Sequence, residues 1–136
     1  MDEAARRALE ITPRSTARER TIDITTVGAR TGSPRRIETW FYRAGDTVYL
    51  TGQPAPRDWY ANLLATPKFT FHLKNDVTAD LPAVATPVTD EAERRSVFAE
   101  ILAGFAEPGN PTGMAREADA LDAWLAGSPL MRVDFS

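Results

Sequence analysis

The stretch TIDITTVGARTGSPRRIETWFYRAGDTVYLT, residues 21–51, decides the fold. Over 21–27, β-branched residues alternate with polar ones, which predicts a half-buried strand. Segments 35–43 and 47–51 are also rich in aromatic and β-branched residues, and the AGD at 44–46 predicts a hairpin turn between them. Consecutive strands joined by short turns imply a largely antiparallel sheet.

The rest of the chain predicts three further strands and four helices. The strands are 68–74, 77–88 and 129–135, and the helices are 2–10, 58–66, 90–106 and roughly 114–126. About six strands with few helices favour a mainly β, α+β fold, in which packed helices close an antiparallel barrel. The 136 residues suit one domain, 1–136, with 1–20 as an N-terminal helical arm.

Charge is unevenly spread along the chain, whose formal net charge is -3. Residues 1–43 carry nine arginines against six acidic residues, a net of +3, and residues 44–136 carry seven basic against thirteen acidic residues. The basic first third is suited to attracting an anionic small molecule. The acidic total and the lack of a lysine-rich tract argue against a nucleic-acid partner.

Composition also excludes several classes of site. With no cysteine and one histidine, the chain offers neither a disulfide framework nor a thiolate or multi-histidine metal site, so we expect no metal. No apolar run is long enough to cross a bilayer. The N-terminal MDEAARRALE lacks the apolar core of a secretory signal, so we expect a cytoplasmic protein.

The segment GARTGSPRR, residues 28–36, places two glycines, a proline and three arginines between two predicted strands. A turn requires the glycines but not the arginines, whereas an anion site uses both. The segment alone leaves both interpretations open.

Two longer blocks narrow this choice. TTVGARTGSPRRIETWFYRAGDTVYL (25–50), followed by RDWYANLLATPKFTFHLK (57–74), resembles the deazaflavin (F420)-dependent nitroreductase and quinone reductase family of actinobacteria. That family's blocks are T-x-G-[RA]-[KR]-[ST]-G-x-P-R and W-Y-x-N-L-x-x-N-P. They are matched by Thr26, Gly28, Ala29, Arg30, Thr31, Gly32, Pro34 and Arg35, and by Trp59, Tyr60, Asn62, Leu63 and Pro67. The resemblance implies the split β-barrel of the flavin and deazaflavin oxidoreductase superfamily.

The resemblance also implies coenzyme F420, whose tail carries a phosphate and several carboxylates. Arg30, Thr31 and Arg35 are the residues it implies for the tail, because arginines form charge-assisted, often bidentate bonds to such groups. In the next loop, Thr51 and Gly52 are candidates to approach the ring by their backbone, and Arg57 to reach the tail. Strand alternation would place Arg36 on the opposite face from Arg35.

The implied protein is an enzyme that transfers a hydride from the reduced coenzyme to a planar, apolar acceptor, such as a quinone, nitroaromatic or conjugated alkene. Candidates for the substrate pocket are the aromatic residues Trp40, Tyr42, Phe105 and Trp124. The candidate catalytic group is His72, the one side chain with an ordinary pKa near neutral. A strand histidine without a chemical role is the alternative for that position.

Other functions on the same fold stay open. The loop TGQPAPRDW (51–59) is two residues shorter than the family's and lacks its histidine, and no tyrosine lies in the C-terminal third. One alternative is a protein with no deazaflavin role that binds a fatty acid, haem or a flavin such as FMN. Another is a cofactor-free biosynthetic enzyme that uses the same pocket. In every case we expect a small-molecule partner and a monomer or homodimer.

Overall fold

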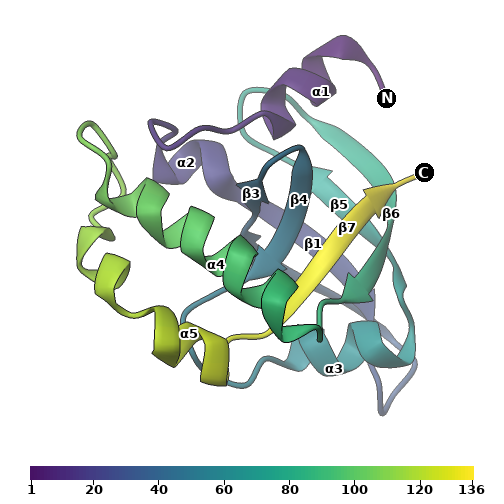
Figure 1. Ribbon diagram of the computed structural model, residues 1–136. Helices are drawn as coiled ribbons and strands as arrows, with labels where there is room; N and C mark the ends of the chain where they lie inside the picture. Colours follow the sequence, from purple (N-terminus) through teal and green to yellow (C-terminus); the bar gives the residue numbers. More distant parts are fainter.

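The computed structural model describes residues 1–136 and has the expected α+β architecture, a seven-stranded sheet curled into a half-barrel with helices around it (Figure 1). The strands are β1 Thr21–Val27, β2 Pro34–Trp40, β3 Tyr42–Ala44, β4 Thr47–Thr51, β5 Lys68–Leu73, β6 Ala79–Pro87 and β7 Leu130–Phe135. The helices are α1 Glu3–Leu9, α2 Ala17–Arg20, α3 Asp58–Ala65, α4 Glu91–Ala106 and α5 Leu121–Gly127, with a 3₁₀ helix η1 at Ala115–Asp119. The predicted split-barrel class is confirmed.

The sheet runs β2-β1-β5-β6-β7-β4-β3, and every neighbouring pair is antiparallel. Its two edge strands, β2 and β3, are consecutive in the chain and separated only by Phe41. The Phe41 N–H donates to the Arg20 carbonyl, 2.9 Å away, instead of extending the strand. The predicted strand 35–43 is therefore wrong as one element, and the sheet has seven strands instead of six.

Two apolar clusters stabilise the sheet. The larger one lies between the sheet, α1 and α3, and includes Ile24, Phe71 and Met131, all with no exposed surface. The smaller one joins β3, β4 and β7 to α4 and α5 through Phe98 and Trp124, whose rings meet edge-on with centroids 5.8 Å apart. Strand alternation supplies one set of side chains to each cluster, so the sheet is buried on both faces over much of its area.

The helices differ from expectation in two places. The short helix α2 was not predicted, and the predicted helix 114–126 is two elements, η1 and α5, separated at Ala120.

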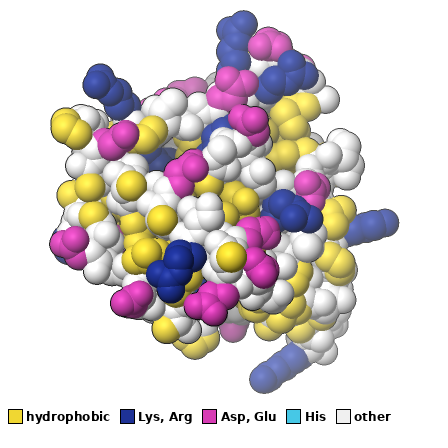
Figure 2. Space-filling model, viewed as in Figure 1, with side chains coloured by type: hydrophobic (Ala, Val, Ile, Leu, Met, Phe, Trp, Pro, Cys, Tyr) yellow, Lys and Arg dark blue, Asp and Glu magenta, His cyan; other side chains and the backbone are white.

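No helix combines the length and the hydropathy needed to span a bilayer. On the face shown in Figure 2, acidic and basic side chains are interspersed.

Candidate functional site

The loop between β1 and β2 is closed by its own backbone. The Gly28 N–H donates to the Ser33 carbonyl and the Gly32 N–H donates to the Gly28 carbonyl, both at 2.8 Å. A Cβ at Gly28 would lie 2.7 Å from Thr31 Oγ1, and Gly32 has a φ of 71°, which favours glycine. Both glycines are therefore needed to build this loop, which presents Ala29–Ser33 to solvent.

Asn62 of α3 fixes the loop to the sheet. Its Oδ1 accepts from the Ala29 N–H at 2.9 Å, and its Nδ2 donates to Thr26 Oγ1 at 3.1 Å. These contacts explain why the two sequence blocks occur together, since the second block holds the first in position.

Replacing Asn62 by alanine should therefore loosen the loop. Two hydrogen bonds worth about 1 kcal/mol each are lost, so we expect a fall of several degrees in Tm and weaker binding of any anion held at this loop. Leu64→Ala is the matched control, because Leu64 lies on the same helix and is 54% exposed. Thermal unfolding of both variants checks the prediction, and equal Tm values would contradict it.

The arginines of the loop have different surroundings. Arg36 points to the outer face of the sheet, as predicted, where its Nε donates to Asp23 Oδ2 at 2.9 Å. Arg30 and Arg35 are exposed, and neither forms an ion pair or a side-chain hydrogen bond within the chain. These two guanidinium groups are therefore free to receive an anion.

A cavity of about 430 Å³, which we call the edge groove, opens beside β2. Its walls come from Ile37–Trp40, from Tyr42, from residues 51–53 with Arg57, and from Trp59 and Met114. In the antiparallel pair of β1 and β2, Arg35 lies opposite Thr26 and Ile37 lies opposite Ile24. Thr26 and Ile24 are both on the buried face of β1. Arg35 thus lies on the same face as the groove residue Ile37, about 7 Å along the strand. The segment 28–36, which we call the arginine loop, therefore adjoins the edge groove through Arg35.

The loop after β4 forms the opposite wall. Thr51 is 3% exposed, and its hydroxyl donates to the Pro129 carbonyl, so only its backbone is available to a ligand. The Arg57 guanidinium donates to the Gln53 carbonyl at 2.8 Å and crosses close over Gly52, where a Cβ would lie 3.0 Å from Arg57 Nη2. Gly52 is thus the position that lets Arg57 lie across this wall.

The sequence-derived site residues other than His72 divide into three groups. The edge groove brings together Trp40, Tyr42, Thr51, Gly52 and Arg57, while Arg30 and Thr31 lie in the adjoining loop and Arg35 at the start of β2. Trp124 has no exposed surface and its Nε1 donates to Glu117 at 3.1 Å, while Phe105 is 2% exposed; neither lines the edge groove.

His72 lies on the other face of the sheet. Its Nε2 is 2.7 Å from Thr25 Oγ1 and its Nδ1 is 2.6 Å from Asp80 Oδ1, which lowers the pKa of the Asp80 carboxyl through this hydrogen bond. His72 of β5 lies opposite Asp23 of β1 in the sheet, and the Asp23 side chain binds Arg36 on the outer face. His72 itself does not line the edge groove, and the contacts reach it only indirectly, because Asp23 also binds Lys74, which binds the groove residue Glu38.

Several groove residues were not among the sequence-derived candidates. Ile37 could have been found, because it alternates with Arg35 on a predicted strand and is 38% exposed despite being apolar. Trp59, which matches the second family block, is 6% exposed and also lines the groove. Gln53 and Met114 had no local signal, since η1 approaches the groove only in the folded chain.

Tyr42 separates the edge groove from a second cavity and is 5% exposed. Burial raises the pKa of its phenol to about 12, against the opposing effect of Arg20 and Arg57. The hydroxyl is therefore protonated at neutral pH and available as a hydrogen-bond donor.

This burial predicts a specific loss of stability at high pH. The unfolded-state phenol ionises near pH 10 and the folded one near 12, so ionisation favours the unfolded chain as the pH rises through that window. At pH 11 the folded state should lose about 1.4 kcal/mol relative to pH 8 through this group. Denaturant titration of wild type and Tyr42→Phe at both pH values isolates the effect, since Tyr49 titrates in both proteins. An equal pH dependence would show that the phenol is not buried.

The chain matches the profile of the F420H(2)-dependent quinone reductases over residues 5–107. It belongs to this family.

Among solved structures, a conserved hypothetical protein from Mycobacterium tuberculosis has a TM-score of 0.68 at 19% identity, covering 99% of this chain and 81% of that one. An F420 reductase has a TM-score of 0.62 at 17% identity, covering 100% and 96%. The haem storage protein of Vibrio cholerae has a TM-score of 0.56 at 16% identity, covering 86% and 82%. At these identities the structural likeness establishes the fold.

Family membership confirms the resemblance and establishes coenzyme F420 as the cofactor and a small molecule as the substrate. The residues present fit this coenzyme. Its anionic tail requires cations without partners, which Arg30 and Arg35 provide, and a close backbone approach, which the glycine cradle at Gly28 allows. Its planar ring requires an apolar slot, and the edge groove has Ile37 and Trp59 in its walls.

Proposed function

We propose that this family member uses reduced F420 to reduce a planar, apolar acceptor, a quinone, nitroaromatic or conjugated alkene, in the edge groove. The observation that carries the proposal is that two unpartnered arginines, Arg30 in the loop before β2 and Arg35 on the groove face of β2, adjoin a groove with aromatic walls. When bound, the reduced coenzyme supplies a hydride. The protein supplies binding, orientation and exclusion of water.

The tail is assigned to Arg30 and Thr31 of the loop and to Arg35, which shares a face of β2 with the groove residue Ile37. Arg57, held over Gly52 by its bond to Gln53, adds a third cation on the opposite wall. The loop and the groove together therefore offer cations for an anionic tail and aromatic side chains for a planar ring.

The acceptor is assigned to the inner part of the groove, where Trp40, Tyr42 and Met114 form the walls. The Trp40 and Tyr42 rings are tilted by 49° with centroids 6.4 Å apart, so they present aromatic surface without stacking on each other. Met114 adds a flexible thioether side chain that adapts to acceptors of different outline. The backbone of Thr51 and Gly52 is the polar surface beside the ring.

A panel of acceptors tests this assignment. With reduced F420, we expect turnover of menadione, nitrobenzene and cyclohexenone and none of cyclohexanone, which has similar size but no conjugated system. Trp40→Ala should raise KM for menadione about tenfold while changing the Kd for F420 less than threefold, since it removes one aromatic contact worth about 1–1.5 kcal/mol. Equal rates with cyclohexanone, or an unchanged KM in Trp40→Ala, would overturn the assignment of the acceptor.

A further inference from the structure

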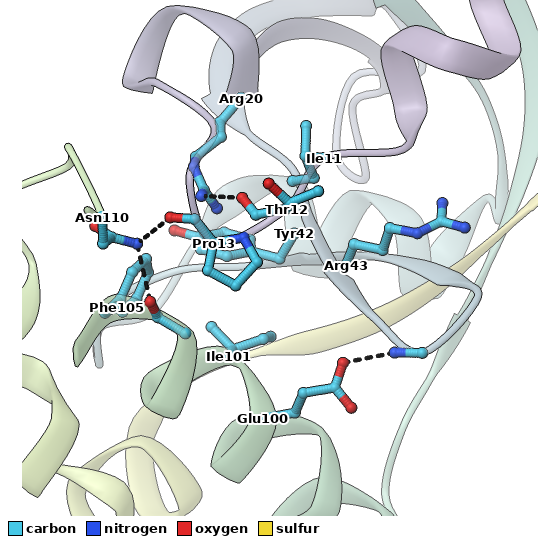
Figure 3. A pocket seen from close by; sticks show the side chains of 12 residues that line it. Ile11, Thr12, Pro13, Arg20, Tyr42, Arg43, Glu100, Ile101, Phe105 and Asn110 are labelled. Carbon is cyan, nitrogen blue, oxygen red and sulfur yellow. Dashed lines mark hydrogen bonds between the residues drawn. The ribbon is translucent and has the colours of Figure 1, made fainter. Parts of the chain in front are cut away.

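A second cavity, of about 200 Å³, lies on the other side of Tyr42 from the edge groove, and we call it the Arg20 cavity. Figure 3 shows it enclosed by the segment carrying Ile11–Pro13, by the β3–β4 hairpin and by one face of α4. Its apolar walls include Ile101 and Phe105. Neither the family match nor the proposed reaction assigns a role to this cavity.

Arg20 is an unusual residue to find in its wall. It is 6% exposed, and among the buried residues it is the only arginine, lysine, aspartate or glutamate. No carboxylate lies within ion-pair distance of it, and the loss of hydration on burial lowers the pKa of its guanidinium. A buried charge without a counter-charge is costly, and proteins usually pair such groups.

The guanidinium of Arg20 is only partly satisfied by the protein. Nε donates to the Ser15 carbonyl at 3.1 Å and Nη2 donates to the Thr12 carbonyl at 2.8 Å, whereas Nη1 has no acceptor. The Tyr42 hydroxyl also has no partner in the chain. Ser128 Oγ is the one side-chain polar atom that is both fully enclosed and unpartnered, so Arg20 Nη1 and Tyr42 Oη each keep accessible surface. Two donors of buried residues are thus left open at one cavity.

The other polar groups of the cavity are already engaged. Arg43 Nη1 donates to the Leu9 carbonyl at 3.2 Å, and its Nη2 lies 3.9 Å from Asp46. Glu100 Oε2 accepts from the Gly45 N–H at 2.6 Å, at the end of the cavity under the hairpin turn (Figure 3). Asn110 Nδ2 donates to the Pro13 and Gly104 carbonyls. Because Arg43 already lies near Asp46, Arg20 is the one lining cation without a carboxylate nearby, and a single uncompensated charge favours a monoanion over a dianion or a neutral ligand.

We propose that the Arg20 cavity binds a small apolar monocarboxylate. Its carboxylate would accept from Arg20 Nη1 and Tyr42 Oη, and its apolar body would pack against Ile101 and Phe105. The ligand would supply the counter-charge that the fold does not provide for Arg20. This site is separate from the edge groove and does not depend on the proposed reaction, although both sites share Tyr42.

NMR titration with benzoate tests the proposal on the full chain. We expect saturable shifts of the Arg20 Nε–Hε and Ile101 methyl signals. Benzamide, which has the same ring but no charge, should cause no saturable shift, and inorganic phosphate should bind at least tenfold more weakly than benzoate.

Variants locate the site independently of any effect on folding. Tyr42→Phe should raise the benzoate Kd about tenfold, because it removes one hydrogen bond to a charged group. Tyr49→Phe is the matched control, since Tyr49 is 7% exposed and pairs with Tyr42 across the hairpin but does not line the cavity. Arg20→Lys, if folded, should weaken binding by a similar factor. Absence of saturable shifts, equal binding of benzamide, tighter binding of phosphate, or an unchanged Kd in Tyr42→Phe would each overturn the proposal.

Discussion

Replacing Arg30 and Arg35 together by alanine should raise the Kd for coenzyme F420 at least a hundredfold. Both guanidinium groups are exposed and unpartnered, so each is available for charge-assisted hydrogen bonds to the anionic tail. Each such bond contributes about 1.5–3 kcal/mol, and about 3 kcal/mol corresponds to a hundredfold change in affinity. Fluorescence titration with oxidised F420 measures the effect. The fold should be unaffected, because both side chains are exposed and neither forms an ion pair or a side-chain hydrogen bond within the chain.

Arg36→Ala is the matched control for this pair. Arg36 is adjacent to Arg35, carries the same charge and lies on the opposite face of β2, where it binds Asp23. Its removal should leave the F420 affinity within twofold of wild type at moderate ionic strength, where long-range effects are screened. If Arg36→Ala weakened binding as much as the double variant, the net charge of the region and not the geometry of the loop would determine affinity.

Replacing Trp124 by alanine should have the largest effect on stability. Its side chain has no exposed surface, contacts the rings of Phe98 and Phe105, and donates to Glu117. Truncation of a buried tryptophan costs about 3–5 kcal/mol, which corresponds to a fall in Tm of about 10 °C or more. Thermal unfolding monitored by circular dichroism measures this loss.

The same variant distinguishes a packing role from a substrate-binding role. At a temperature where it remains folded, Trp124→Ala should bind F420 as wild type does, because Trp124 lies outside the edge groove. Trp40→Ala is the comparison, and we expect it to change KM for the acceptor with a smaller loss of stability. A Trp124→Ala protein with normal Tm and abolished turnover would instead place Trp124 at the substrate.

The sequence predicts the elements whose residues alternate regularly or keep helical spacing. This holds for β1 and α4, in which burial follows the periodicity of the residues. The break at Phe41 was not predictable, because Trp40, Phe41 and Tyr42 are all aromatic and nothing local marks the residue whose N–H pairs with Arg20. Helix α2 did have a signal, the capping box of Thr16 and Glu19, both halves of which form.

In the site too, residues in short segments could be predicted from the sequence, whereas residues brought together only by folding could not. The arginine loop and the residues 51–57 could be named from sequence because glycines and arginines stand in short segments between strands. The groove also needs Met114, which precedes a 3₁₀ helix held near Gln53 by the bond from Gln53 to Glu117. The Arg20 cavity depends on three segments that meet only after folding, so no sequence pattern marks it.

Isotope transfer tests the central claim most directly, namely that the protein catalyses hydride transfer from reduced F420 to an acceptor. The coenzyme would be reduced with deuterium at its transferable position and mixed with the protein and cyclohexenone under anaerobic conditions, and the product analysed by mass spectrometry. We expect one deuterium on carbon in the cyclohexanone formed, and none when Arg30→Ala/Arg35→Ala replaces wild type at a limiting coenzyme concentration. Product without deuterium, or no product from wild-type protein shown by fluorescence to bind the coenzyme, would contradict the claim.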